Sequence, residues 1–247
     1  MQIANDTLDS IEAVFQSALS DLQVCVETEA EQNKDMETID TALHQLLDIL
    51  YATDKVAVSG KGLEQELTAD DITSIGDHGM KLIAECADWA TQLERNEARM
   101  QFESISYPLA LWVARHGGKI ETLDTVVNGL AAISNQSYDA DDLEVITAHT
   151  GQIIHAANAT LTQDRDRSNP QRPWRILHLN YGITATRTHN TSLMEESFET
   201  LVHNIPDDAD DFFREGMEQM EALDYPIHVR AVMEKYFTQW SGSKTLH

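Results

Sequence analysis

One segment of the chain combines side chains that recognise carboxylates with aromatic residues that supply contact area. It carries five arginines and two aromatic residues between positions 164 and 189: Arg165, Arg167, Arg172, Trp174, Arg175, Tyr181 and Arg187. A guanidinium group binds a carboxylate through two parallel hydrogen bonds, and Trp and Tyr are frequent anchors of protein interfaces. The segment is therefore a candidate site for an acidic peptide or for the C-terminal carboxylate of a protein.

The same arginines have an alternative role inside the protein. The protein carries 42 acidic and 17 basic side chains, for a net charge of −25, whereas residues 164–189 carry a net positive charge. In such a protein the guanidinium groups can pair with carboxylates of the same molecule, which reduces self-repulsion and fixes a loop. The sequence leaves both interpretations open.

Ten histidines raise the question of metal binding. No His has a Glu three residues before it, as the carboxylate-bridged dimetal bundles require, and His-Glu-x-x-His is absent. Three looser pairs and one looser set place carboxylates near imidazoles at helical spacing: His44 with Asp48, Glu199 with His203, Asp224 with His228, and Asp71 with His78 and Glu85. We expect solvated pairs on helix faces, with a site built from converging ligands as the alternative.

Other catalytic and cofactor motifs are missing. The sequence has no G-x-S-x-G elbow, no Walker phosphate loop and no dinucleotide fingerprint after a strand, so we expect no cofactor. The run from Ser59 to Gly62, Ser-Gly-Lys-Gly, lacks the Walker spacing and is predicted to be a flexible linker. The Asp-rich runs 139–142 and 207–211 lack the spacing of a calcium loop and are predicted to begin helices.

Charge and hydropathy exclude further classes. A large acidic excess opposes binding to nucleic acid or to anionic membranes, since both require Lys and Arg to replace counterions. No apolar run approaches the length of a membrane-spanning helix, and the first residues do not have the pattern of a secretory signal. We therefore expect a cytoplasmic protein, in which Cys25 and Cys86 are buried thiols on helical stripes.

The N-terminal part, residues 1–100, is predicted to be a helical bundle. Apolar residues recur there every three or four positions, and no proline occurs before Pro108. The clearest stripe is Ile72, Ile75, Gly79, Leu82, Cys86, Trp89 and Leu93, and Thr68 with Asp71 has the form of a capping box that would begin this helix. We expect a loop across 53–68, where the pattern lapses.

The remaining part, 101–247, is predicted to consist of shorter helices that pair into stacked antiparallel hairpins, forming a short α-solenoid or an irregular bundle that can be continuous with the first part. The periodicity predicts helices over 103–116, 173–188, 191–204, 207–223 and 226–240, with Pro108 starting or kinking the first of these. No strand-like alternation occurs, so the predicted fold class is all-α.

The pattern around Trp174 resembles a tetratricopeptide repeat. Trp174, Leu177 and Tyr181 have the spacing of the first repeat helix, with His178 at the family's Gly position. Met194, Phe198 and Pro206 have the spacing of the second half but arrive four residues late. The resemblance covers 174–206, with a looser echo over 107–134. It implies paired helices whose concave face holds peptides, and it puts Arg172 and Arg175 on that face.

These observations favour a non-enzymatic adaptor that binds a protein or an acidic peptide. The alternatives are a helical metal-binding protein or metal-dependent hydrolase that uses His, Asp and Glu, and an acidic mimic of nucleic acid. A homodimer formed through the last helix is a further expectation, with a capping core as the alternative, because that helix is apolar on more than one side: Val229, Val232, Met233, Tyr236, Phe237 and Trp240.

Overall fold

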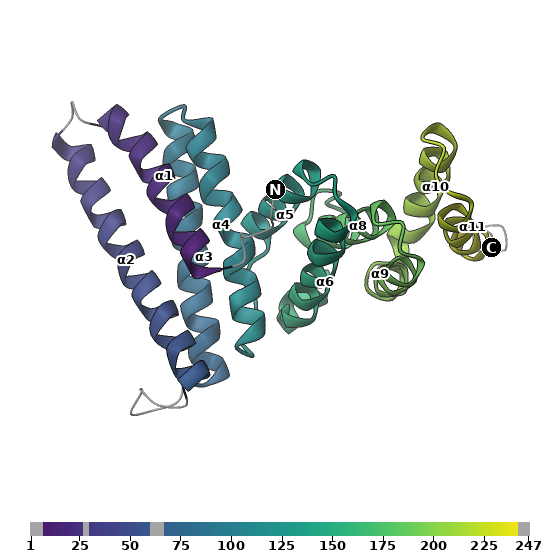
Figure 1. The fold of residues 1–247 in the computed structure, drawn as a ribbon, viewed down its shortest axis with the longest axis horizontal. Helices are drawn as coiled ribbons and strands as arrows, with labels where there is room; N and C mark the ends of the chain where they lie inside the picture. The colour runs from purple at the N-terminus through teal and green to yellow at the C-terminus, as the bar shows by residue number, and fades with distance from the viewer. Residues whose placement is uncertain (1–6, 27–29, 60–66, 242–247) are drawn as a thin grey trace. The chain divides into compact units, whose positions relative to one another are not determined.

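The computed structural model describes residues 7–26, 30–59 and 67–241 of the 247-residue protein. These residues form eleven helices and no strand, apart from one isolated parallel bridge between Ile120 and Ala157, and the all-α prediction is confirmed (Figure 1). No helix in the described ranges is both long enough and apolar enough to cross a membrane.

The protein divides into two compact units. The first contains residues 1–133 with 155–158, and the second contains 134–154 with 159–247. Helices of the first unit are α1 (Leu8–Val26), α2 (Ala30–Ser59), α3 (Ala69–Gln92), α4 (Asn96–Arg115) and α5 (Asp124–Gln136). The remaining helices are α6 (Ala140–Ala156), α7 (Ala159–Thr162), α8 (Pro173–Arg187), α9 (Thr191–Asn204), α10 (Pro206–Ala222) and α11 (Ile227–Ser241). The last three residues of α5 belong to the second unit, and the last two of α6 to the first.

The four long helices of the first unit form a bundle. Helix α4 packs against both α1 and α3, and α2 packs against α1 and α3 (Figure 1). Their apolar stripes meet in a core of fully buried side chains, including Leu22, Leu50, Ile83 and Phe102. The rings of Phe15 and Phe102 meet edge to face, with centroids 5.7 Å apart, which is a favoured aromatic geometry.

Helix α3 begins and packs as its sequence predicts. The Thr68 hydroxyl accepts a hydrogen bond from the Asp71 backbone N–H at 3.2 Å, and the Asp71 carboxylate accepts one from the Thr68 N–H at 2.8 Å, which completes the capping box. Gly79 faces the ends of Leu46 and Leu109, and its missing side chain permits this close approach of helices. Cys86 is fully buried on the same helix, whereas the side chain of Cys25 lies outside the described residues.

Two predicted boundaries in the first unit differ from the structure. The predicted loop across 53–68 is shortened, because α2 continues to Ser59; no Gly or Pro interrupts it earlier, and the Thr53 hydroxyl donates to the Ile49 carbonyl within the helix. The predicted linker around Gly60 and Gly62 lies outside the described residues. The expected division near residue 100 falls inside α4, which begins at Asn96 and includes Pro108 in its interior.

The second unit contains two helix hairpins whose bounds match the predicted segments to within a few residues. Helix α9 packs on α8, α11 packs on α10, and α9 also contacts α10 and α11. Asn190 caps α9 through hydrogen bonds to two backbone N–H groups, and Pro206 occupies the first turn of α10, where no N–H is needed. An aromatic cluster of Phe198, Phe213 and Tyr236 joins the two hairpins, with ring centroids 5.1–5.4 Å apart.

Candidate partner-binding surface

The arginine-rich segment lies before and within α8, and its central residue is buried. The Arg172 side chain is only 7% exposed, and its Nε lies 2.7 Å from an Asp164 carboxylate oxygen. Its terminal nitrogens reach Asp208 at 2.5 Å and the Asn169 carbonyl at 3.2 Å. Asp164 adopts a left-handed backbone conformation with φ of 42°, which Asp tolerates better than most residues. Arg172 thus ties the preceding loop to the start of α10.

Two further arginines pair with the first turn of α10. Arg175 Nε lies 2.6 Å from the second oxygen of Asp208, and Arg167 lies 2.8 Å from Asp207. The carboxylates at this N-terminus also interact favourably with the helix dipole. The Asp-rich run 207–211 therefore begins a helix, as predicted, and its first two residues also pair with three arginines of the segment.

Trp174 and Tyr181, predicted as contact area for a partner, are buried inside the second unit. The Trp174 ring packs on the His178 ring with centroids 4.3 Å apart, and its indole N–H has no hydrogen-bond partner among the described residues. Leu177, Met194 and Phe198 are also buried, so the residues of the repeat-like pattern form the interior of the α8–α9 hairpin.

His178 is a neutral histidine held in this interior. Its Nδ1 donates to the Trp174 carbonyl at 2.8 Å, and its Nε2 accepts from the Asn204 side-chain amide at 2.8 Å. Burial lowers the pKa of His178 to about 4, since desolvation disfavours the charged imidazolium. His178 is therefore a packing residue of this interior.

The two outer arginines of the segment differ from each other. Arg187 donates to the backbone carbonyls of Ser134 at 2.8 Å and Ser137 at 2.6 Å, which anchors the end of α5 to α8 within the second unit. Arg165 is exposed. Intramolecular partners therefore account for Arg167, Arg172, Arg175 and Arg187, as in the second of the two interpretations drawn from the sequence. A role for the segment in binding a partner stays a prediction.

The looser histidine and carboxylate sets do not converge. Asp71 caps α3, while His78 and Glu85 are exposed on the same helix. His44 donates to the carbonyl of Asp40, one turn before it in α2, whereas its predicted partner Asp48 lies one turn after it. In 7–26, 30–59 and 67–241, no group of three His, Cys, Asp or Glu side chains is arranged to hold a metal ion.

A polar pocket of about 330 Å³ lies in the first unit. Asp54 accepts a hydrogen bond from the Trp112 indole at 2.9 Å and lies 3.2 Å from His116 Nε2, while His116 Nδ1 lies 2.9 Å from the Trp112 carbonyl. Tyr51 donates to Asp9 at 2.7 Å and to Glu12 at 3.0 Å. Burial and these hydrogen bonds raise the pKa of Tyr51. Each polar group described here already has a partner, so the pocket holds a satisfied network.

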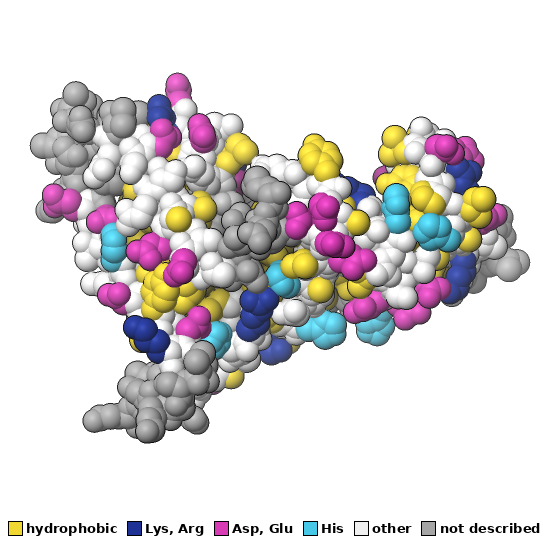
Figure 2. Space-filling view, viewed as in Figure 1, with side chains coloured by type: hydrophobic (Ala, Val, Ile, Leu, Met, Phe, Trp, Pro, Cys, Tyr) yellow, Lys and Arg dark blue, Asp and Glu magenta, His cyan; other side chains and the backbone are white. Residues whose placement is uncertain are grey.

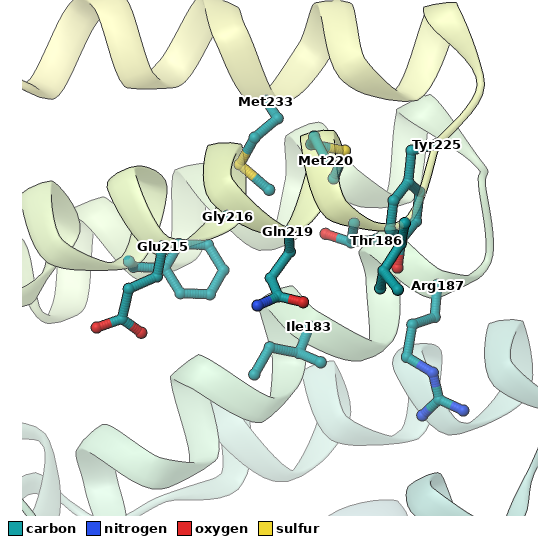
Figure 3. Close-up of a pocket in the computed structure, with 11 residues that line it drawn as sticks. Ile183, Thr186, Arg187, Glu215, Gly216, Gln219, Met220, Tyr225 and Met233 are labelled. Atoms are coloured by element: carbon teal, nitrogen blue, oxygen red, sulfur yellow. The ribbon is translucent and has the colours of Figure 1, made fainter.

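An apolar groove of about 340 Å³ lies between α8, α10 and α11 in the second unit. Figure 3 shows Ile183 of α8 facing Met220 and Met233 across the groove, with Glu215 and Arg187 towards opposite ends. The residues that line it are Ile183, Thr186, Arg187, Phe212, Glu215, Gly216, Gln219, Met220, Leu223, Tyr225 and Met233. Most of these side chains are apolar, as in ligand and peptide grooves generally.

Two large apolar side chains of the lining remain exposed to solvent. Ile183 is 48% exposed and Leu223 is 63% exposed, and Ile227, two residues beyond Tyr225, is 87% exposed. In the space-filling view, apolar and acidic side chains lie next to each other over α10 (Figure 2). An apolar surface bordered by charged residues is typical of an interaction site.

Sequence reasoning did not identify this groove, although one signal for it exists. Phe212 and Phe213 are adjacent, which makes α10 apolar on two faces: Phe213 is fully buried in the core, whereas Phe212 lines the groove. The last helix, which we expected to offer a dimer surface, directs most of its stripe inward. Val229, Val232, Met233 and Tyr236 are buried within the unit.

Comparison with known proteins gives no relative: no family model, no curated protein and no solved structure matches this sequence.

Proposed function

We propose that this protein is a non-enzymatic interaction module that binds a partner protein in the groove between α8, α10 and α11. The observation that carries the proposal is the exposed apolar lining of that groove, above all Ile183 and Leu223. Leaving large apolar side chains in water costs roughly 1.5–3 kcal/mol each compared with burying them. Because Ile183 and Leu223 are already partly buried, a partner that covers them gains part of this free energy on binding.

The extent of the apolar surface favours a macromolecule over a small ligand. The cavity is at the lower end of the roughly 300–1,000 Å³ typical of ligand pockets, while the exposed Ile227 extends the apolar surface beyond its lining. Two methionines, Met220 and Met233, line the groove but are almost fully buried, so the apolar surface open to a partner comes mainly from Ile183, Leu223 and Ile227.

The helix pairs α8–α9 and α10–α11 are consistent with a helical-repeat protein, and we propose tetratricopeptide-like hairpins as their origin. In this proposal the binding surface is the α8–α10–α11 groove, with the arginine segment as a brace that holds α8 to α10. A cytoplasmic location, expected from the sequence, is part of the same proposal.

Site-specific photo-crosslinking tests the proposed function. A photoreactive amino acid at Ile183 should link the protein in its own cells to one defined partner, whereas the same amino acid at Val145 should not. Val145 is a matched control, because it lies on another helix of the second unit and is similarly exposed, 42% against 48%.

The purified partner provides the second step of the test. Its binding should fall at least tenfold with Ile183→Asp and stay unchanged with Val145→Asp. Equal crosslinking at both positions, or equal loss of affinity in both variants, would rule out the groove as the binding surface.

A further inference from the structure

We propose that the groove accepts a cationic amphipathic helix, with apolar side chains on one face and Lys or Arg along the edge that meets α10. This inference rests on the proposed function and names the class of partner. It is carried by two separate features of the second unit: the construction of the groove walls, and the charge of α10.

The walls of the groove select for a helical occupant. All three walls are α-helices, so their backbone N–H and C=O groups are already paired within each helix and offer no ladder to an extended peptide. What they present is side-chain surface from Ile183, Phe212 and Leu223. A helix satisfies its own backbone hydrogen bonds and needs only such an apolar surface, as in other helix-in-groove complexes.

The charge of α10 selects for a basic occupant. The helix contains seven acidic residues and one basic residue, Arg214. Arg214 lies 2.5 Å from Asp211 and 3.9 Å from Asp210 at the start of the helix. Further along, Glu215 lines the groove, and Glu218 and Glu221 are exposed.

No ion pair joins these three glutamates to any residue that the structure describes. Glu215, which lines the apolar groove, is complementary to a Lys or Arg side chain that flanks an apolar face, and the charges of Glu218 and Glu221 on the same helix add to the attraction at longer range. Such pairs steer the encounter and fix the orientation of the bound helix.

A second copy of this protein is a poorer occupant on the same grounds. The net charge is −25, and in the second unit α6, α9 and α10 each carry more acidic than basic residues. Bringing two copies together at this groove would oppose like charges, which is destabilising. The same negative charge that would repel a second copy attracts a cationic partner.

Three synthetic peptides of about 18 residues, long enough to form an isolated helix, test the inference with the full-length protein. The first has Leu and Met at helical spacing flanked by Lys. The second replaces every Lys by Glu, and the third keeps Lys but replaces Leu and Met by Ser. Several registers of the first peptide are used, so that fit does not depend on one spacing.

The Lys peptide should bind, the Glu peptide should bind at least about thirtyfold more weakly, and the Ser peptide should not bind measurably below ~1 mM. On the protein, Glu215→Lys with Glu218→Lys should weaken the Lys peptide about tenfold and strengthen the Glu peptide. The control pair, Asp141→Lys with Glu196→Lys, makes the same change in net charge on exposed positions of α6 and α9 and should leave both affinities nearly unchanged.

Four results would overturn the inference. The first is equal binding of the Lys and Glu peptides, and the second is the absence of binding by any Lys peptide. The third is binding of the Ser peptide as strong as that of the Lys peptide, which would indicate an electrostatic mimic of nucleic acid. The fourth is a dimer, seen in sedimentation, that Ile183→Asp dissociates. If the crosslinked partner still depends on Ile183 in these cases, the proposed function stands and only the class of partner is wrong. If Ile183→Asp leaves the partner bound, both fail.

Discussion

The two units of the protein are both helical, but they bury different kinds of side chain. Among the described residues, thirteen polar or charged side chains are buried; two, Thr53 and Ser106, belong to the first unit, and eleven belong to the second. The first unit is stabilised mainly by apolar stripes and close helix contacts. The second depends on partnered polar groups, chiefly the Arg172 network and His178, and it also leaves an apolar groove uncovered.

Because they bury different side chains, the two units should respond differently to pH, to salt and to single substitutions. Apolar packing tolerates shifts in pH and salt, whereas a buried polar network is stable only while every member keeps its partner and its protonation state. The second unit should therefore be the more sensitive to substitutions of single polar residues, and to acid.

The largest effect is expected for Arg172→Met. Removing the guanidinium leaves the buried Asp164 without its ion-pair partner and leaves Asp208 with Arg175 alone, and breaking a buried pair in this way costs about 3–5 kcal/mol. Urea denaturation gives the free energy of unfolding. Arg167→Met is the matched control, because the exposed Arg167–Asp207 pair is worth at most about 1 kcal/mol. Equal losses in the two variants would contradict the contrast between buried and exposed pairs.

A pH-dependent loss of stability is expected from His178. Its pKa is about 4 when folded and 6.5 as an ordinary value, so the unfolded state binds more protons between these limits. Stability should therefore be fully present above about pH 6.5 and should decrease as the pH falls towards 4, by up to about 3 kcal/mol.

The variant His178→Asn lacks this titration and should show a shallower loss between pH 7 and pH 4.5 in denaturation experiments. Carboxylates titrate in both proteins, so the difference between the two slopes isolates the histidine. Parallel slopes would mean that His178 is protonated without cost in the folded protein.

A smaller effect is expected in the first unit from Gly79→Ala. The added methyl carbon would lie 2.8 Å from a Leu109 carbon and 3.0 Å from a Leu46 carbon. Overpacking of this kind costs about 1–3 kcal/mol, against a gain of about 1 kcal/mol in helix propensity. We expect a net loss near 1 kcal/mol by thermal and urea denaturation, with the exposed Ser74→Ala on the same helix as control. A gain in stability would show that the two leucines move aside freely.

The smallest effect on stability is expected for Ile183→Asp. Its side chain is half exposed, so unfolding free energy should change by no more than about 0.5 kcal/mol even though partner binding is lost. Calorimetry of Ile183→Asp and of Val145→Asp measures their stability to unfolding, for comparison with the loss of partner binding. A loss of several kcal/mol would instead assign Ile183 to the core of the second unit.

The sequence predicted the elements better than it predicted their contacts. The bounds of α8 to α11 follow from apolar periodicity and from local signals such as Asn190 and Pro206, which act on their own helices. The capping box of α3 is equally local. The early start of α4 was missed because Pro108 suggested a helix boundary, although the helix accommodates it.

The candidate site was harder to predict, because its chemistry depends on residues that are distant in the sequence. The partners of Arg172 are Asp164, eight positions before it, and Asp208, 36 positions after it, and nothing in either spacing identifies them. The groove likewise forms only when three helices pack. The adjacent Phe212 and Phe213 are the one signal in the sequence that α10 has two apolar faces, and it was not recognised.

Cys86 gives the first unit a built-in reporter of its opening. Cys86 lies on α3, its side chain is fully buried in the bundle, and burial raises the pKa of its thiol to about 12. A thiol reagent can therefore react with it only when the bundle opens. With Cys25 replaced by Ser, the rate of labelling at Cys86 measures how often that opening occurs under native conditions. The kinetics of the first bundle can thus be followed separately, while a partner occupies the groove of the second unit.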